Sequence, residues 1–177
     1  MNEPVIRHSQ IKDLRAIESI YANEVLTGLG TFEVVAPSLE EHTQRRQKLL
    51  DNGFPFLVAC INEKVVGYAY ASPYRPRAAY QNSIENSVYV DNQVRNRGVG
   101  KLLLERLITT CENGPWRQMI AVIGNSKNTG SIALHEKLGF RHVGTIEAVG
   151  YKLDQWVDTV IMQRALNNGS STNPVKR

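Results

Sequence analysis

The sequence predicts one mixed domain of the α/β or α+β class. Its 177 residues suit a single domain with a sizeable core. Apolar residues recur with helical spacing in some segments and as strand-like runs in others, and the two kinds of segment are interspersed along the chain. We find no internal repeat and no second domain. We therefore assign residues 1–166 to one domain and expect the polar residues 167–177 to form a flexible tail.

The first half of the chain predicts two helices between strands. Ser38 and Glu41 form a capping-box pattern that starts the second helix. Pro73 ends the second strand of a hairpin, because proline cannot donate to a strand ladder. The expected elements are a strand at 5–7, helices at 13–26 and 38–50, and strands at 56–61 and 65–71.

The second half predicts strands that alternate with two further helices. Gly139 marks the end of the second of these helices, and Phe140 and Trp156 are expected in the core. The expected elements are a strand at 84–90, a helix that ends near residue 113, a strand at 119–123, a short helix at 131–138, and strands at 140–145 and 157–162.

Composition and charge exclude several classes of function. The net charge of +4 is mild and its basic residues are dispersed, whereas nucleic-acid binding usually requires a continuous basic face. No apolar run approaches the length of a membrane span, and the first residues do not form a signal peptide. Cys60 and Cys111 lie in apolar segments and are expected to be buried free thiols of a cytoplasmic protein. No Cys/His spacing suits a metal site.

A glycine loop between a strand and a helix is the main functional signal. Arg95, Gly98 and Gly100 follow the strand that ends at Val90, and an apolar helix follows them. Such a loop points backbone N–H groups at one spot beside a helix N-terminus, which favours a phosphate. Arg95, Arg97 and Lys101 add positive charge there. An ordinary surface loop with two glycines is the alternative, and the spacing matches neither a Walker A loop nor a dinucleotide fingerprint.

Two motifs resemble those of the GNAT N-acetyltransferase superfamily. The Arg95-x-x-Gly98-x-Gly100 loop after Val88-Tyr89-Val90 is similar to its acyl-CoA diphosphate motif, and Asn128-x-x-Ser131 to Gly139-Phe140 is similar to its second motif. Within the superfamily the chain resembles phosphinothricin and methionine-sulfoximine acetyltransferases. The segments that carry this likeness are 31–33, 67–71, 85–90, 134–140 and 150–158.

This resemblance implies a GNAT fold, in which a splayed, twisted mixed β-sheet is flanked by helices. It implies acetyl-CoA as the acetyl donor, with the pantetheine arm beside the strand that contains Val88 and the diphosphate on the glycine loop. Asn125 competes with Asn128 for the cofactor contact, and the motif spacing favours Asn128. Family members are commonly homodimers. The implied cofactor-binding residues are Val88, Tyr89, Val90, Asn96, Arg97, Gly98, Val99, Gly100, Lys101 and Asn128.

Acetyl transfer to an amine requires a neutral amine, and therefore a group that takes its proton. Glu85 is the candidate base, because strand alternation places it with Ser87 and Tyr89 on the face opposite Asn86. A solvated glutamate near a strand end is the alternative, and the resemblance favours the base.

Other residues have candidate roles in the same chemistry. His135 is either an acid/base or orienting residue of the site, as the resemblance implies, or an ordinary core histidine. A backbone N–H near Val88 suits the oxyanion. Tyr89 and Tyr151 are both candidate acids for the departing thiolate, and the sequence does not choose between them.

The loop at 74–80 is the expected site for the acid groups of the acceptor. Guanidinium groups bind carboxylate or phosphinate oxygens in fork geometry, although two arginines in a loop are more often simply solvated. The substrate-binding residues that the resemblance implies are Phe32, Arg75, Pro76, Arg77, Tyr80, Glu85, Asn86 and Ser87.

We therefore expect a cytoplasmic N-acetyltransferase that acts on the α-amine of a small amino-acid analogue. The alternatives are acetylation of a polyamine, an aminoglycoside or a protein N-terminus, and a non-catalytic acyl-CoA-binding module. Two arginines in the acceptor loop argue against cationic acceptors. A sensor would not need Glu85.

Overall fold

The computed structural model describes residues 3–174 as one seven-stranded sheet with helices on both faces. The strands are β1 (Val5–His8), β2 (Phe56–Ile61), β3 (Lys64–Pro73), β4 (Ser83–Val90), β5 (Gln118–Gly124), β6 (Arg141–Lys152) and β7 (Gln155–Ala165). The helices are α1 (Leu14–Thr27), α2 (Leu39–Asp51), α3 (Val99–Glu112) and α4 (Thr129–Lys137). Short 3₁₀ turns are η1 (Ile11–Asp13), η2 (Ala78–Tyr80) and η3 (Asn92–Val94).

The sheet order is β1-β2-β3-β4-β5-β7-β6, and all neighbours are antiparallel except β4 and β5. α3 connects these two parallel strands, as a crossover connection requires. The mixed α/β fold class is therefore confirmed, and the strands and helices expected before residue 140 all occur, within a few residues of their predicted ends.

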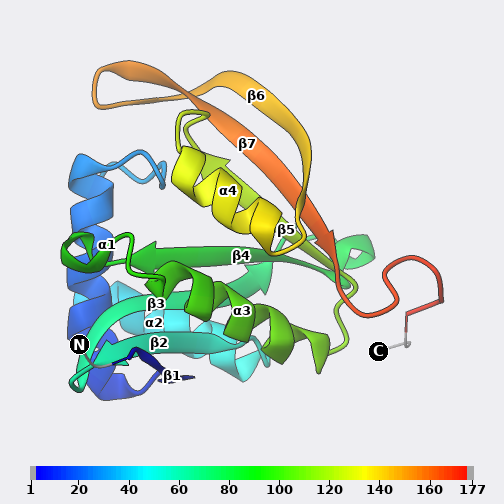
Figure 1. Ribbon diagram of the computed structural model, residues 1–177, viewed down its shortest axis with the longest axis horizontal. Coiled ribbons are helices and arrows are strands. Elements are labelled where there is room, and N and C mark those ends of the chain that lie inside the picture. The colour runs from blue at the N-terminus through cyan, green and yellow to red at the C-terminus, as the bar shows by residue number, and fades with distance from the viewer. Residues whose placement is uncertain (1–2, 175–177) are drawn as a thin grey trace.

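Strand alternation divides the core into two layers. In Figure 1, α3 and α4 lie in front of the sheet and α1 and α2 lie behind it. Leu57, Ala59 and Ala69 pack with α3 in one core cluster, whereas their neighbours Val58 and Tyr68 pack with α1 in the other. The period of two thus decides which helix each strand residue contacts.

Local signals account for the start of α2 and the end of α4. The Ser38 side chain accepts a hydrogen bond from the Glu41 backbone N–H at 3.2 Å, which confirms the N-cap half of the predicted capping box. The Glu41 carboxylate pairs with Arg45 one turn later instead of returning to the Ser38 N–H. Gly139 adopts φ +83° directly after Leu138, the C-cap of α4, a conformation that favours glycine at a helix end.

The β6–β7 hairpin is longer than the sequence predicts. The expected strands at 140–145 and 157–162 extend to Lys152 and back from Gln155. Leu153 and Asp154 form the turn with φ +51° and +57° and lack the glycine that usually marks such a turn. The expectation that Trp156 lies in the core is wrong, because it is 67% exposed near this turn, whereas Phe140 is buried.

The structure also shows the environment of both cysteines and of the residues near the C-terminal end. Cys60 and Cys111 are buried free thiols, as predicted. Leu166 is buried, and Arg117 donates a hydrogen bond at 2.8 Å to the backbone oxygen of Thr172. Residues 175–177 of the expected tail lie outside the described residues, and the flexibility of the tail stays a prediction.

Candidate active site

A cleft of about 1330 Å³ opens where β4 and β5 separate. The two strands pair from Ser83 with Gln118 to Asn86 with Ala121, and β5 then continues beside β7 alone. From Ser87 to Val90, β4 keeps β3 on one side and faces the cleft on the other. Its backbone N–H and C=O groups on that side can bind an extended ligand as an added strand.

The glycine loop lines one end of this cleft. Asn96 and Gly98 adopt φ +62° and +79°, and Gly98 is the N-cap of α3. Alternation of left-handed and helical residues gathers backbone N–H groups into an anion-binding concavity, which the helix dipole reinforces. A Cβ on Gly100 would meet only Leu134 and Val90 at 3.5 and 3.6 Å, so the protein itself does not require glycine there.

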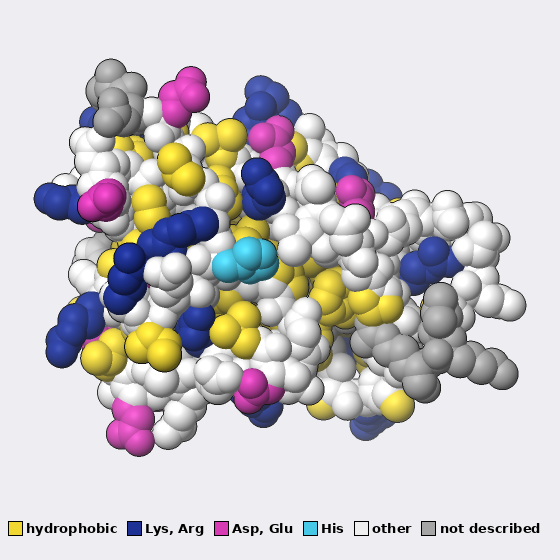
Figure 2. Space-filling model, turned by 90° about the horizontal axis from the view of Figure 1, so that it is seen from below, with side chains coloured by type: hydrophobic (Ala, Val, Ile, Leu, Met, Phe, Trp, Pro, Cys, Tyr) yellow, Lys and Arg dark blue, Asp and Glu magenta, His cyan; other side chains and the backbone are white. Residues whose placement is uncertain are grey.

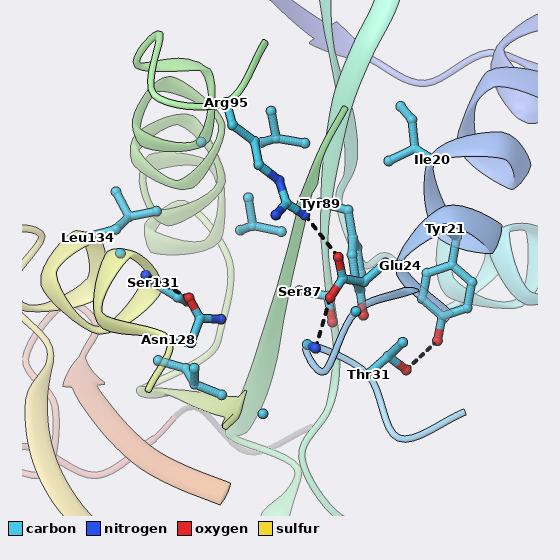
Figure 3. Close-up of a pocket in the computed structure, with 18 of the residues that line it drawn as sticks. Ile20, Tyr21, Glu24, Thr31, Ser87, Tyr89, Arg95, Asn128, Ser131 and Leu134 are labelled. Carbon is cyan, nitrogen blue, oxygen red and sulfur yellow. Dashed lines mark hydrogen bonds and ion pairs between the residues drawn. The ribbon is translucent and has the colours of Figure 1, made fainter. Parts of the chain in front are cut away.

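The N-terminus of α4 lies across the cleft from β4. Asn128 caps it, since its Oδ1 accepts from the Ser131 backbone N–H at 3.2 Å (Figure 3). This contact fixes the amide, so that its NH₂ group is oriented by the helix end. Asn125, the alternative candidate, also lines the cleft, and its Oδ1 accepts from the Lys127 N–H at 2.9 Å.

Glu85 lies one residue before the point at which the strands separate. It lines the cleft and is only partly exposed. Burial raises the pKa of its carboxyl group, and the positive charge of Arg75 opposes the shift. A carboxylate with a raised pKa in a cleft is a better proton acceptor than one in water, which suits a general base.

Two tyrosines, Tyr70 and Tyr89, lie on the same face of the sheet as Glu85. Tyr70 is opposite Ser87 in the β3–β4 pairing and lines the cleft. Burial raises the pKa of Tyr70, and a hydrogen bond with Ser87 opposes this shift. Sequence reasoning missed Tyr70, although its place two residues after Tyr68 in the predicted hairpin puts it on that face. Tyr89 also lines the cleft, whereas the other candidate acid, Tyr151, is 58% exposed on β6 and does not.

His135 and Asn86 form a buried pair on the opposite face. Nε2 of His135 lies 2.9 Å from Nδ2 of Asn86, and Nδ1 of His135 lies 2.8 Å from the backbone oxygen of Ser131. Burial lowers the pKa of His135, so the ring is neutral at neutral pH. Both residues line the cleft.

The segment after α1 forms the opposite wall. Gly28 to Phe32 line the cleft, and a Cβ on Gly124 at the end of β5 would lie 2.1 Å from the backbone oxygen of Leu29. This close approach requires glycine. The Tyr21 hydroxyl is 2.9 Å from that of Thr31, and Glu24 contacts both Arg95 and Gly30 (Figure 3). Sequence reasoning missed Tyr21 and Glu24, because only the fold brings α1 to this site.

Most of the predicted site residues line this cleft, but the predicted residues of the 74–80 loop and Arg97 do not. Phe32, Glu85 to Val90, Asn96, Gly98 to Lys101, Asn128 and His135 all border it. The residues outside its lining are Arg75, Pro76, Arg77, Tyr80 and Arg97. Residues 75–80 of this loop are exposed and Tyr74 is partly buried, with the Arg75 guanidinium 5.1 Å from the centre of the Tyr74 ring. Its role in binding stays a prediction.

The fold and the site together define a class of protein. The sheet opens between two parallel strands, an anion-binding loop precedes a helix at the opening, and a carboxylate with a raised pKa stands at its inner end. This is the architecture of a transferase that takes a group from an extended, phosphate-bearing carrier.

Comparisons with known proteins agree with this class. The model of the acetyltransferase (GNAT) domain matches residues 6–161. The chain is 50% identical to the phosphinothricin N-acetyltransferase of Alcaligenes faecalis, over 92% of this chain and 82% of that protein. It is 34% identical to the L-methionine sulfoximine/L-methionine sulfone acetyltransferase of Pseudomonas aeruginosa, over 92% and 94%. A phosphinothricin acetyltransferase from Sinorhizobium meliloti, crystallised with acetyl-CoA, superposes with a TM-score of 0.95 at 41% identity, over 98% and 94%.

The chain belongs to the GNAT acetyltransferase family. The predicted GNAT fold and the prediction of an acetyl-CoA-dependent N-acetyltransferase are thereby confirmed. The roles of individual residues stay predictions.

Proposed function

We propose that this enzyme acetylates the α-amine of a small amino-acid analogue of the phosphinothricin or methionine-sulfoximine type. Relatives that share a third to a half of its residues carry these names. The position of Glu85 is the main support for this cleft as the site of acetyl transfer. Its carboxylate has a raised pKa and borders the cleft where β4 and β5 separate.

Acetyl-CoA fits the cleft from the glycine loop to Ser87. Residues 96–101 would hold the diphosphate through backbone N–H groups, and Asn128 would contact the same carrier from α4. The edge of β4 from Ser87 to Val90 would pair with the amides of the pantetheine arm. Acetyl-CoA supplies an activated acetyl group, and the protein supplies alignment and proton transfer.

Glu85 would take the proton of the incoming amine, directly or through a water molecule. A backbone N–H at the open edge of β4 would stabilise the developing oxyanion. Tyr89 is better placed than Tyr151 to protonate the departing thiolate, because only Tyr89 borders the cleft, and burial keeps its phenol protonated. His135 lines the cleft with both ring nitrogens already within hydrogen-bond distance of partners, which favours an orienting role.

The acceptor would lie between Glu85 and the wall after α1. Phe32, Tyr70 and Ser87 border this side of the cleft and offer both an apolar surface and hydroxyl groups. Arg75 is near enough to influence the pKa of Glu85, so it suits the acid group of an amino-acid-like acceptor better than Arg77 does.

A thiol-release assay tests the proposed acceptor. The purified enzyme and acetyl-CoA are combined with phosphinothricin, methionine sulfoximine, spermidine, an aminoglycoside or an alanine-initiated peptide. We expect turnover with the first two amines alone. A preference for spermidine or the peptide would refute the proposed acceptor class while leaving N-acetyl transfer intact. Acetyl-CoA binding without turnover of any amine would favour a binding module.

We also propose that the enzyme is a cytoplasmic homodimer that does not bind nucleic acid. The β6–β7 hairpin exposes large apolar side chains that a second copy could cover: Val143, Ile146, Val149, Tyr151, Leu153 and Trp156. Light scattering of the protein and of Trp156→Glu tests the dimer. Basic side chains on the face in Figure 2 are interrupted by acidic, polar and apolar ones, unlike a nucleic-acid-binding surface.

Buried free thiols suit a reducing compartment. Within residues 3–174, no helix has both the length and the apolar character needed to cross a membrane.

A further inference from the structure

The Asn86 side chain occupies the last paired position of β4 before the sheet opens. It lines the cleft and is only 6% exposed. Its Nδ2 atom lies 2.9 Å from Nε2 of His135. This pair joins β4 to α4 across the inner end of the cleft.

The partners of His135 determine how the Asn86 amide is oriented. The backbone oxygen of Ser131 lies 2.8 Å from Nδ1 and can only accept, so Nδ1 carries the proton. Nε2 of the neutral ring therefore accepts a hydrogen bond from the NH₂ group of Asn86. The reversed amide would set the Asn86 oxygen against the lone pair of Nε2. The His135 ring is itself held edge-on to Phe140, with 4.9 Å between centroids.

This orientation leaves the Asn86 oxygen as a buried acceptor. Oδ1 has no hydrogen-bond partner among residues 3–174. A buried carbonyl without a donor is costly, and such atoms in native proteins call for an explanation. Oδ1 itself has almost no accessible surface, although Asn86 borders the cleft, so a molecule that fills the cleft supplies the missing donor through a small shift of this side chain towards it.

We propose that Asn86 Oδ1 accepts a hydrogen bond from an N–H group of the bound reactants, and that His135 is the positioning residue that aims it. The inference rests on the proposed function, which brings two N–H donors to the inner end of the cleft. One is the pantetheine amide next to the thioester, and the other is the acceptor amine. Asn86 thus acts opposite Glu85, which lies on the other face of β4, and its partner His135 exchanges no proton with substrate.

Both ring nitrogens of His135 support this assignment. An acid/base histidine needs one nitrogen directed at a reactant, whereas Nδ1 and Nε2 here face Ser131 and Asn86. Protonation would place an N–H on Nε2 against the NH₂ group of Asn86 and break the pair. The structure therefore favours one fixed tautomer over a titrating group.

The test compares Asn86→Ala, His135→Phe and the double variant, with His142→Phe as the matched control. His142 is exposed on β6 and does not line the cleft. Calorimetry gives the affinity for CoA, and steady-state kinetics give KM and kcat for the acceptor. We expect each single variant to lose roughly three- to tenfold in one of these quantities, the size of one neutral hydrogen bond. The double variant should lose no more than the worse single variant, because the two residues act as a unit.

The affected quantity identifies the donor. Weaker CoA binding with an unchanged acceptor KM assigns the pantetheine amide, and the reverse assigns the acceptor amine. Unchanged values in Asn86→Ala would overturn the proposal. A second result would also overturn it: His135→Phe loses one limb of the pH–rate profile, whereas Asn86→Ala keeps that limb. Such a difference would identify His135 as an acid/base group.

Two further measurements keep the test independent of folding and of turnover. Asn86→Asp preserves the shape if Asn86→Ala unfolds, and it should raise the pKa of His135 by placing a carboxylate against Nε2. The ¹⁵N shifts of the ring report its tautomer without any reaction. A proton on Nε2 in the wild type would refute the orientation, whereas failure to acetylate any amine would refute only the proposed function.

Discussion

One carboxylate oxygen of Glu24 lies 2.9 Å from Nη2 of Arg95, and the other lies 2.8 Å from the backbone nitrogen of Gly30 (Figure 3). A single side chain of α1 therefore connects the glycine loop to the wall on the acceptor side. Glu24 is 15% exposed and Arg95 54% exposed in this ion pair, so its contribution to stability is about 1 kcal/mol or less. Its effect on ligands is the more informative quantity.

We predict that Glu24→Gln tightens acetyl-CoA binding severalfold. Glutamine keeps an oxygen for the Gly30 N–H but removes the negative charge, so Arg95 can direct its full charge to the diphosphate. The gain should fall with added salt. Calorimetry at two salt concentrations measures it. Glu112→Gln is the matched control, because Glu112 pairs with Arg164 at 2.9 Å and does not line the cleft. Weaker binding in Glu24→Gln would mean that the ion pair chiefly positions the loop.

We predict that Glu85→Gln lowers kcat/KM by roughly 10²- to 10⁴-fold without weakening CoA binding, as expected on loss of a general base. The wild-type rate should rise with pH through a carboxyl pKa above the ordinary value of 4.5, because burial raises it. A pH–rate profile measures this limb. An active Glu85→Gln enzyme with an unaltered profile would assign the base elsewhere.

The same substitution should stabilise the protein near neutral pH. Since the folded-state pKa of Glu85 is raised, the folded state binds more protons than the unfolded state between the two pKa values. Wild-type stability therefore falls as pH rises through that window, and glutamine avoids this loss. Thermal unfolding should give Glu85→Gln a higher Tm at pH 7 and an equal Tm below the ordinary carboxyl range. A lower Tm at both pH values would contradict buried charge as the cause.

The sequence predicted the parts of the site that depend on contiguous residues. Gly98 and Gly100 were accessible because a loop–helix junction is a local pattern. Strand alternation gave only the face on which Glu85 lies, and the resemblance favoured its role as the base, which stays a prediction. Tyr21 and Glu24 were not accessible, because the chain after α1 must fold back to bring Thr31 to Tyr21, and Arg95 lies 71 residues after Glu24 in the sequence. The resemblance supplied the splay between β4 and β5, which no local pattern specifies.

The length of the β6–β7 hairpin was not predicted for a different reason. Its outer part is exposed on β6, so burial imposes little alternation there, and its turn uses Leu153 and Asp154 at positive φ. Trp156 was expected in the core because large aromatic residues are usually well buried. Its exposure here reflects a strand pair that extends beyond the helices, as Figure 1 shows.

We predict that Gly100→Ala weakens CoA binding while raising stability. The position is helical and a Cβ there makes only ordinary contacts, so alanine should add about 0.4–1 kcal/mol by restricting the unfolded chain. The same methyl group would stand between the backbone and the diphosphate. Calorimetry and thermal unfolding measure the two effects. Unimpaired CoA binding in a stabilised variant would place the diphosphate elsewhere.

The arginine loop offers a comparison between neighbours, because Arg75 and Arg77 are both exposed but only Arg75 influences the pKa of Glu85. We predict that Arg75→Ala raises the acceptor KM roughly tenfold or more, the size of a charge-assisted hydrogen bond. Arg77→Ala should have a smaller effect, and neither variant should change CoA affinity. Arg75→Ala should also move the Glu85 limb of the pH–rate profile to higher pH, since a positive charge that favours the carboxylate is lost. Steady-state kinetics across pH with both variants measure these effects. A larger KM change in Arg77→Ala, with an unmoved limb in Arg75→Ala, would assign the acid group of the acceptor to Arg77.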